Sequence, residues 1–301
     1  MNNDFSDIRF SVDGSEKLGY WIESKTDSVS AKVWVKIPSI PANSSVSLGI
    51  YYGNSSATAQ SAISNVFIRE ISNLKGFWNM DESIGNSVGD YSGYSNNGTA
   101  YGATTIDGKF DKARLFDGQN DYITGPSTGF PSGTTARSLT YWAKPTANTG
   151  NYQIVFHYGP ITAQQGWGSG ITASDQKWYV SQIGLDTRAN SIDWGNWVFI
   201  AITQNDSGGY IIYQNGIQIA TGTMATNTVL SNFLIGQHSS NYWFSGVIDD
   251  LAFYDKVLNV QEITDIYNNR TYAIPSHTGN SLVRKYSEAE PSYVIGQEEM
   301  N

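Results

Sequence analysis

The stretch GKFDKARLFDGQNDYI, from Gly108 to Ile123, decides the fold because it places two apolar runs around a sharp turn. The first run ends at Asp117-Gly118, and apolar residues return at Tyr122-Ile123. Asp-Gly between two such runs is a strong hairpin signal, because glycine takes a positive φ without steric cost. The stretch therefore predicts a β-hairpin: a strand, a tight turn and a second strand.

The composition around this stretch is that of an all-β protein. The chain has 301 residues, 40% of them hydrophobic and 15% charged, so it can bury one large core or two smaller ones. Aromatic residues make up 13%, with 19 Tyr and 9 Trp, which favours strands. The 30 glycines indicate that many turns join these strands.

The charge balance and the missing cysteines exclude several classes of function. The net charge of -9 and the pI near 4.7 exclude a nucleic-acid partner, which needs clustered Lys and Arg. Zero cysteines exclude disulfides, zinc-thiolate sites and thiol catalysis. The sequence also contains no signal peptide and no apolar run near 18 residues. We therefore expect a soluble chain that does not insert into a membrane.

Residues 1–67 predict a smaller β-sandwich-like module built from short strands. The segment AKVWVKI, residues 31–37, alternates strictly, with its valines and Ile37 on one side. Pro38 and Pro41 end this strand, because proline cannot donate to a sheet ladder.

The same region resembles a known but uncharacterised module. The resemblance rests on the segments DFSDIRF, YWIE, VWVKIPSIPA and YYGN, in this order. Such modules occur in archaeal and bacterial surface proteins, often just before a laminin-G-like jelly roll. They usually begin earlier, with an aromatic and Arg-containing strand that is missing here. The resemblance thus implies either a fragment or a strand position that another segment fills.

Residues 74–270 predict a larger two-sheet sandwich. Strands are expected at residues 77–82, 113–116, 122–123, 138–144, 153–157, 178–183, 197–203, 210–214, 217–220, 233–235 and 246–254. Asn215-Gly216 is a second hairpin signal. Ten or more strands without an intervening helix imply two large sheets packed face to face. One helix is expected after the cap Asn259, with Val260, Ile263, Ile266 and Tyr267 at helical spacing.

This larger region resembles the laminin-G-like jelly roll of the concanavalin A-like lectin and glucanase fold. The segments that carry the resemblance are FWNMDE, DYSGYSNNG, GKFDKARLFDGQNDYI, SLTYWAKP, WVFIAIT, YQNG and GVIDDLAFYDKVL. They follow the order of the family. The resemblance implies that the first and last strands lie side by side, but a fold is not a function.

Residues 271–301 form a tail with one apolar segment. Its sequence resembles the segment that follows the jelly roll in surface proteins with the first module. We expect Ser292 to Gln297 either to return as a strand to that module or to be a frayed terminus.

No catalytic constellation stands out. Glucanases of this fold need two carboxylates about 5 Å apart, yet no glutamate lies between Glu82 and Glu262. The aspartates that could form a pair all lie in stretches that the fold uses structurally: Asp117, Asp121, Asp249 and Asp250. There is no HExxH helix, no phosphate-binding glycine loop and no nucleophile motif beside a histidine. We therefore expect no enzyme, with a glycoside hydrolase as a distant third alternative.

A structural calcium ion is a more plausible cofactor. Calcium prefers carboxylate, amide and carbonyl oxygens in loops, which Asp90 and Asn97 can supply. Adjacent first and last strands would also bring Glu82 near Asp249 or Asp250, where a cation would relieve the repulsion between carboxylates. The alternative is that Asp90 and Asn97 cap turns and that Asp249 accepts hydrogen bonds from backbone amides.

Candidate ligand-binding residues are the aromatic side chains that are not expected to pack in the core. Four tryptophans stand beside Gly, Ser, Asp or Asn, where an exposed ring can stack on a sugar: Trp167, Trp178, Trp194 and Trp243. Nearby side chains that can form hydrogen bonds are His157, Tyr158, Gln237, His238 and Tyr242. The other tryptophans in strands, Trp34, Trp78, Trp142 and Trp197, are expected to pack in cores.

Two functions from different classes follow. The first is a non-catalytic binding protein of the cell surface or extracellular space that uses the jelly roll to bind a glycan or polysaccharide. The second is a structural or adhesive component of a surface layer or filament that contacts another surface protein, with a strand donated to the incomplete first module. Five glycosylation sequons, starting at Asn43, Asn54, Asn97, Asn205 and Asn269, agree with an exposed location.

Overall fold

The structure, a computed structural model, describes residues 1–12, 14, 16–37, 45–62, 66, 71–181, 186–238 and 242–269. The described residues up to 66 belong to one compact unit, and those from 71 onward belong to another. The expected tail strand from Ser292 to Gln297 lies outside the described residues.

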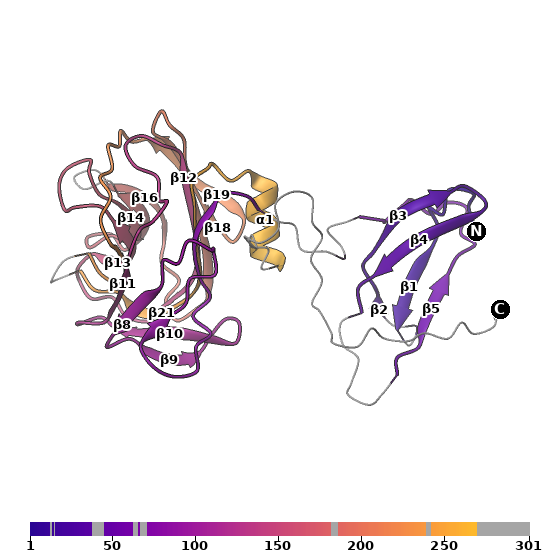
Figure 1. Cartoon of the computed structure of the whole chain (residues 1–301), viewed down its shortest axis with the longest axis horizontal. Helices are drawn as coiled ribbons and strands as arrows, with labels where there is room; N and C mark the ends of the chain where they lie inside the picture. Colours follow the sequence, from indigo (N-terminus) through magenta and orange to yellow (C-terminus); the bar gives the residue numbers. More distant parts are fainter. Residues whose placement is uncertain are drawn as a thin grey trace. The chain divides into compact units, whose positions relative to one another are not determined.

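The first unit contains two small antiparallel sheets (Figure 1). Their strands are β1 (Arg9–Val12), β2 (Glu16–Lys17), β3 (Tyr20–Thr26), β4 (Ser30–Val35) and β5 (Leu48–Tyr51), paired in the orders β2-β1-β5 and β3-β4. A small buried cluster includes Phe10 and Tyr20. The valines of β4 and Ile37 pack against this cluster, which confirms the predicted alternation.

The second unit is a sandwich of two large antiparallel sheets, as predicted. The β12 sheet has the order β19 (Ile217–Thr223), β18 (Gly209–Gln214), β17 (Val198–Gln204), β12 (Arg137–Pro145), β21 (Ser245–Tyr254), β10 (Lys112–Asp117) and β9 (Thr104–Asp107), and β6 (Leu74–Trp78) also pairs with β21. The pairing of β6 with β21 confirms that the first and last strands are neighbours.

The β14 sheet faces the β12 sheet across the core. Its order is β16 (Asp186–Ser191), β15 (Lys177–Ser181), β14 (Trp167–Ile171), β13 (Gln153–Tyr158), β20 (Phe233–Ile235), β11 (Tyr122–Gly125), β8 (Gly98–Tyr101) and β7 (Ser87–Val88). The core between the sheets is rich in aromatic rings, including the fully buried Trp78, Phe156 and Phe253.

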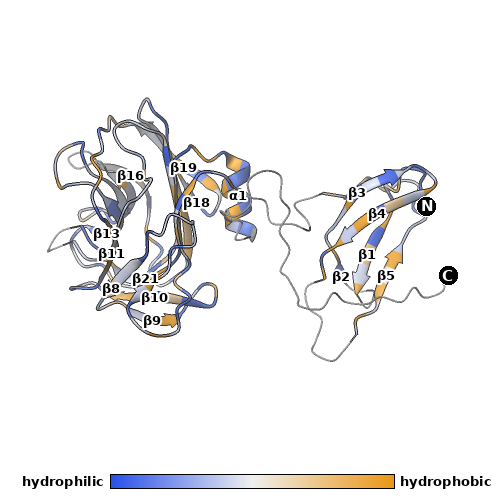
Figure 2. Cartoon of the chain, in the orientation of Figure 1, coloured by the Kyte–Doolittle hydropathy of each residue, from blue (hydrophilic) through white to orange (hydrophobic). Residues whose placement is uncertain are grey.

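The helix α1 (Val260–Asn269) covers the outer face of the β12 sheet. Figures 1 and 2 show it beside β18 and β19, with apolar stretches on the helix and the strands. Asn259 Oδ1 accepts a bond from the Glu262 backbone N–H at 2.9 Å, and Glu262 returns a carboxylate oxygen to the Asn259 N–H at 2.9 Å. Ile263 and Ile266 are fully buried, whereas Val260, at the start of the helix, is 57% exposed.

The stretch from Gly108 to Ile123 does not form the predicted hairpin. Both strands and the turn are present, and Gly118 has a φ of 78°. However, β10 pairs with β9 and β21 in one sheet, whereas β11 pairs with β8 and β20 in the other. Within the turn, the Asp117 backbone N–H donates to Asp121 Oδ2 at 2.9 Å. The stretch is therefore an arch that crosses between the two sheets.

The second hairpin signal behaves as predicted. β18 and β19 pair directly, with Gln214 opposite Ile217. The two loop residues, Asn215 and Gly216, have φ values of 52° and 80°, as a two-residue turn with both residues at positive φ requires.

Candidate ligand-binding site

The outer face of the β14 sheet is low along one of its strands and higher along the strands on either side. Alternation sends Trp178 and Val180 of β15 into the core and leaves Tyr179 on the outside. On β14, Gly168 and Gly170 take the outward positions, so no side chain rises from that strand. The glycines therefore form the floor of a hollow between β13 and β15.

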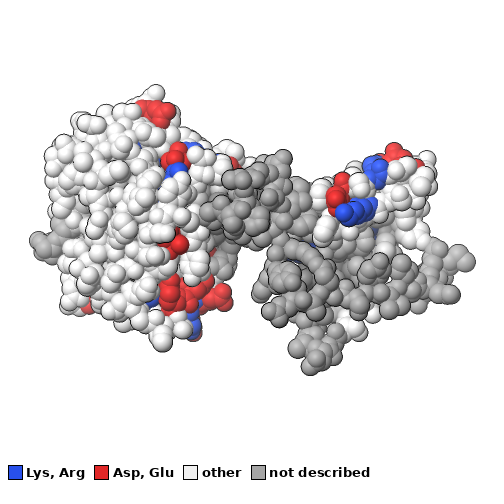
Figure 3. All heavy atoms as spheres, viewed as in Figure 1, with Lys and Arg blue, Asp and Glu red and all other residues white. Residues whose placement is uncertain are grey.

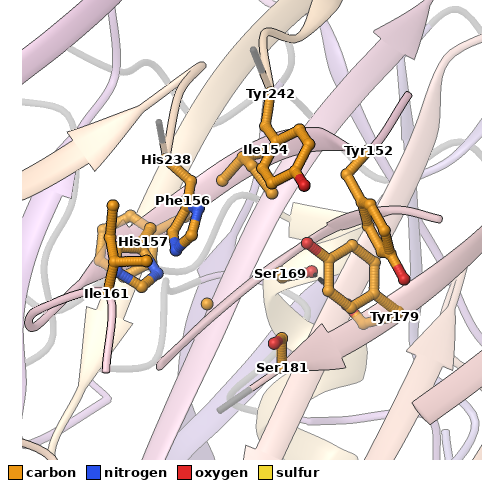
Figure 4. Close-up of a pocket in the computed structure, with 11 residues that line it drawn as sticks. Tyr152, Ile154, Phe156, His157, Ile161, Ser169, Tyr179, Ser181, His238 and Tyr242 are labelled. Carbon is orange, nitrogen blue, oxygen red and sulfur yellow. Dashed lines mark hydrogen bonds between the residues drawn. The ribbon is translucent and has the colours of Figure 1, made fainter. Parts of the chain in front are cut away.

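A pocket of about 240 Å³ lies over this floor. Its lining residues are Tyr152, Ile154, Phe156, His157, Ile161, Gly168, Ser169, Tyr179, Ser181, His238 and Tyr242. Figure 4 shows the two histidine rings at one end, the Tyr152 and Tyr179 rings at the other and the Tyr242 ring between them. The pocket is thus aromatic at both ends and carries hydroxyl and imidazole groups.

The tyrosine end is a cluster of rings that meet edge to face. The Tyr152 ring centroid lies 5.6 Å from that of Tyr179 and 5.6 Å from that of Tyr242. This spacing is typical of favourable aromatic pairs. Tyr179 is almost fully buried, whereas Tyr152 and Tyr242 are half-buried and keep part of their rings open to solvent.

At the histidine end, His157 has a defined protonation state. The His157 and His238 ring centroids lie 4.3 Å apart, nearly perpendicular to each other. His157 Nε2 lies 2.9 Å from the Gly159 carbonyl oxygen, which can only accept, so Nε2 carries the proton and Nδ1 is an acceptor. Burial, followed by the charge of His238, lowers the pKa of His157 to about 3. His157 therefore stays neutral at ordinary pH.

The described lining of the pocket contains no Asp, Glu, Lys or Arg side chain. A charged ligand would therefore find no carboxylate, ammonium or guanidinium partner in that lining, and burying an unpaired charge is costly. The lining therefore suits a neutral ligand with hydroxyl groups and apolar faces.

Five of the eight predicted binding residues do not line the pocket: Trp167, Trp178, Trp194, Trp243 and Tyr158. The first two contradict the prediction most clearly. Trp167 and Trp178 are 0% and 1% exposed, so the prediction that they are exposed is wrong. Trp167 sits on β14 itself and donates from Nε1 to Gln204 Oε1 at 2.7 Å. Gly168 and Gly170, which follow Trp167, are strand residues on the opposite face, and alternation turns the Trp167 ring inward.

Tyr158 is also buried, contrary to its predicted role. Its hydroxyl donates to the Pro131 carbonyl at 3.0 Å and accepts a bond from the buried Arg137 guanidinium. Burial raises the pKa of Tyr158, so the hydroxyl stays neutral. Tyr158 therefore belongs to the core network around Arg137.

Trp194 and Trp243 are half-buried and do not line the pocket. Trp194 packs on the edge of the core between the sheets. Trp243 pairs with Gln237 through the backbone and places its ring centroid 6.2 Å from that of Tyr122.

The structure brings three predicted residues together in the pocket: His157, His238 and Tyr242. The lining residues that sequence reasoning missed are Tyr152, Ile154, Phe156, Ile161, Gly168, Ser169, Tyr179 and Ser181. The alternation in the segment KWYVS, residues 177–181, could have placed Tyr179 and Ser181 opposite the buried Trp178.

The predicted calcium ligands are engaged in hydrogen bonds with the chain. Asp90 accepts four bonds, from Phe77, Ser92 and Asn96, and Asn97 Oδ1 accepts from the Asp90 N–H at 2.9 Å. These are the contacts of turn caps. Within the described ranges, no group of three or more Asp, Glu or His side chains is placed to hold a metal ion.

Glu82 and Asp249 likewise have partners. Glu82 accepts from the Gly89 N–H at 2.6 Å and lies 3.5 Å from the Arg114 guanidinium. Asp249 Oδ2 accepts from the Phe110 N–H at 3.0 Å. The calcium site therefore stays a prediction, with turn capping as the role that these contacts show.

Two family models match the chain. Residues 117–264 match a laminin-G family described as Concanavalin A-like lectin/glucanases superfamily. Residues 4–78 match the family described as Domain of unknown function (DUF2341).

One curated relative and two solved structures illustrate the similarity. Botulinum neurotoxin type X from Clostridium botulinum is 28% identical over 144 residues, a match that covers 44% of this chain and 11% of the toxin. Domain 4 of AbnA, an extracellular arabinanase from Geobacillus stearothermophilus solved with arabinotriose, has a TM-score of 0.53 at 22% identity and covers 65% of this chain and 98% of that chain.

The binding domain of botulinum neurotoxin DC, solved with rat synaptotagmin II, has a TM-score of 0.50 at 17% identity. The similarity covers 65% of this chain and 51% of that chain. At these identities the solved structures show a shared fold. The chain therefore carries a laminin-G-like domain of the concanavalin A-like lectin/glucanases superfamily, preceded by a domain of the DUF2341 family.

Proposed function

We propose that this chain is a non-catalytic carbohydrate-binding protein and that the pocket on the β14 sheet holds one sugar ring of a neutral glycan. The observation that carries the proposal is the lining itself: three tyrosine rings, two histidines and, among the described residues, no Asp, Glu, Lys or Arg. Aromatic faces pack on the CH faces of sugars, while hydroxyl and imidazole groups bond their hydroxyls.

The size and charge of the surface agree with such a ligand. At about 240 Å³ the pocket is smaller than the roughly 300–1,000 Å³ of pockets for drug-sized ligands, so it suits a single ring. Figure 3 shows the sandwich edge-on, with a group of acidic side chains on its lower part and mostly uncharged side chains elsewhere in this view. The described lining of the pocket contains no Lys or Arg, so a polyanionic glycan would find little positive charge there.

A glycosidase is disfavoured at this pocket. Glycoside hydrolysis needs two carboxyl groups about 5–10 Å apart on either side of the bond. The described lining residues contain neither Asp nor Glu. We therefore assign the pocket to binding without catalysis.

The similar proteins support both binding and an exposed location. The arabinanase domain was solved with an oligosaccharide and belongs to an extracellular enzyme. None of the described segments is a helix long and apolar enough to span a bilayer. We accordingly place the protein at the cell surface or outside the cell.

Calorimetric titration of the full chain tests the proposal. The probes are maltotriose, cellotriose and arabinotriose, and the variants are Tyr152→Ala and Tyr242→Ala, whose half-buried rings can be removed without opening the core. We expect at least tenfold weaker binding in each variant, equivalent to about 1.4 kcal/mol. Tyr91→Ala is the matched control, because Tyr91 is 53% exposed and contacts Phe77, which packs on the helix-covered side of the β12 sheet.

Two results would contradict the proposal. One is a failure of all three neutral sugars to bind at millimolar concentration. The other is sugar binding that is equally strong in three variants: Tyr152→Ala, Tyr242→Ala and the control Tyr91→Ala.

A second candidate function is protein contact through the first unit. In the described part of that unit, β5 pairs with β1 alone and presents Leu48, Ile50 and Tyr51 at 39–56% exposure. An exposed apolar edge strand can accept a strand from another chain. Light scattering over a concentration series tests this function. If the chain assembles as its concentration rises and Ile50→Lys abolishes the assembly, the function is supported. A monomer at every concentration argues against it.

A structural calcium ion is a further proposal, based on the oxygen-rich loop around Asp90 and Asn97. Melting with and without EGTA tests it. A higher melting temperature with calcium supports the ion, and identical melting together with no calcium by elemental analysis refutes it.

A further inference from the structure

A second aromatic surface lies on the same sheet as the pocket. Tyr101 of β8 and Tyr122 of β11 are direct cross-strand neighbours, and their rings stack with centroids 4.7 Å apart and planes 13° apart. The Trp243 ring centroid lies 6.2 Å from that of Tyr122. We call these three residues the aromatic platform.

The platform faces outward, away from the core. Ala100 and Ile123 pair with each other between the same two strands and are buried in the core between the sheets. Because side chains alternate along a strand, Tyr101 and Tyr122 point to the opposite face. Tyr101 is 48% exposed, so its ring is available to a ligand.

Strand register places the platform and the pocket in one row across the sheet. Tyr179 of β15 is opposite Gly170 of β14, which is opposite Ile154 of β13. Next to Ile154, the Gly236 N–H donates to the Val155 carbonyl at 3.0 Å. On the far side, the pair of Ile123 with Ile235 sets Tyr122 beside Gly236.

The row therefore runs from Tyr179 to Tyr122 over four strand spacings, or about 19 Å. Between these two aromatic residues it crosses Gly170, Ile154 and Gly236, two of which have no side chain. This distance is longer than one sugar ring. Because Gly170 and Gly236 have no side chains, little rises above the sheet surface between the two aromatic residues.

The loop after β20 contributes to both surfaces. Tyr242 lines the pocket, and the next residue, Trp243, belongs to the platform. Adjacent residues of one loop thus take part in both sites, so the two sites adjoin.

We propose that Tyr101, Tyr122 and Trp243 form a second sugar subsite and that the ligand is a neutral oligosaccharide chain reaching from the pocket to the platform. This inference rests on the proposed carbohydrate binding at the pocket. A chain held at one subsite binds the second intramolecularly, so affinity rises with chain length until both are filled.

Chain-length titration of the full protein is the test. Calorimetry with malto-, cello- and arabino-oligosaccharides of two to six units measures affinity for the wild type, Tyr101→Ala, Tyr101→Phe and Tyr242→Ala. We expect affinity to rise at least tenfold from the shortest ligand that binds to the longest. Tyr101→Ala should abolish that gain and leave the shortest ligand unaffected, Tyr101→Phe should keep the gain, and Tyr242→Ala should weaken binding at every length.

The outcomes separate the second subsite from the pocket. Suppose that sugars bind and that Tyr242→Ala weakens their binding. If affinity then neither rises with chain length nor changes in Tyr101→Ala, the second subsite is overturned while the pocket stands. If no oligosaccharide binds at any length, the proposed function fails and the subsite fails with it. Melting of each variant shows whether the fold is intact.

Discussion

The two outer faces of the sandwich are both formed by antiparallel strands, but they differ in their outward side chains and in whether a helix covers them. On the β12 sheet the outward side chains are large and apolar, and Trp142, Phe199 and Tyr254 are buried beneath α1. On the β14 sheet, glycines and a histidine take outward positions on β13 and β14, and no helix in the described part covers them.

This difference shows how alternation assigns stability and function to opposite sides of one fold. Apolar side chains that point outward require a cover, because exposing them to water is unfavourable. Small or polar outward residues need no cover and leave a hollow. The covered face therefore contributes to stability, and the open face contains the hollow that we propose as a binding site.

Removing a side chain from the covered face should have the largest effect. Ile266 is fully buried under α1, so Ile266→Ala should lower the free energy of unfolding by about 2–5 kcal/mol. Urea unfolding followed by tryptophan fluorescence measures this. Val260→Ala on the same helix is the control, because Val260 is 57% exposed and should change stability little. Equal effects of the two variants would contradict the distinction between covered and open positions.

Adding a side chain to the floor of the open face should cost somewhat less. In Gly170→Ala the new Cβ would lie 2.0 Å from the Gln153 carbonyl oxygen, so the β13–β14 pairing must shift. We expect a loss of about 1–3 kcal/mol in the free energy of unfolding, as for other overpacked sites. Gly195→Ala tests backbone strain alone, because Gly195 has a positive φ but open space around it. A Gly170→Ala protein as stable as the wild type would show that the floor tolerates side chains.

The open face should also make the fold sensitive to acid. Burial depresses the pKa of His157 from its ordinary value of 6.5 to about 3, so the unfolded chain binds a proton more readily than the folded one below pH 6.5. The stability present above pH 6.5 should thus fall with pH, by about 2 kcal/mol at pH 5. Comparing unfolding at pH 7.5 and pH 5 for the wild type and His157→Gln measures the effect. If His157→Gln loses as much stability on acidification as the wild type does, His157 is not the source of the acid sensitivity.

The smallest effect on stability should come from the exposed platform. Tyr101→Ala removes a stacked cross-strand pair, which is worth about 0.2–1 kcal/mol. Thermal melting should therefore change little, even where sugar binding changes strongly. A loss of several kcal/mol would mean that Tyr101 serves the fold and would weaken its assignment to a ligand.

Two turns with similar sequences show what local signals predict. Asn215-Gly216 and Asp117-Gly118 both lie between apolar runs, and both glycines take positive φ as predicted. The first joins paired strands, whereas the second joins strands of different sheets. The second turn is longer, and Asp121 bonds back to Asp117 within it. The turn was predictable because φ is local, but the partner of each strand depends on the packing of distant segments.

The candidate site was predicted only in part, for a related reason. The segment WGSGI, which is β14, looks like a loop because glycine disfavours strands. In the sheet its glycines lie opposite Ile154 and His157, and Trp167 turns into the core. Sequence reasoning therefore took a core tryptophan for an exposed one and missed Tyr179 on the next strand.

By itself the sequence determined the all-β class, the two-domain organisation by resemblance, the cap at Asn259 and the positions of the turns. These follow from alternation, capping and backbone preference, which act over a few residues. Only the tertiary structure decided which sheet each strand joins, which outer face α1 covers and which aromatic rings remain open. Those outcomes depend on contacts between residues far apart in the chain, as in the pocket that Tyr152, Tyr179 and Tyr242 form together.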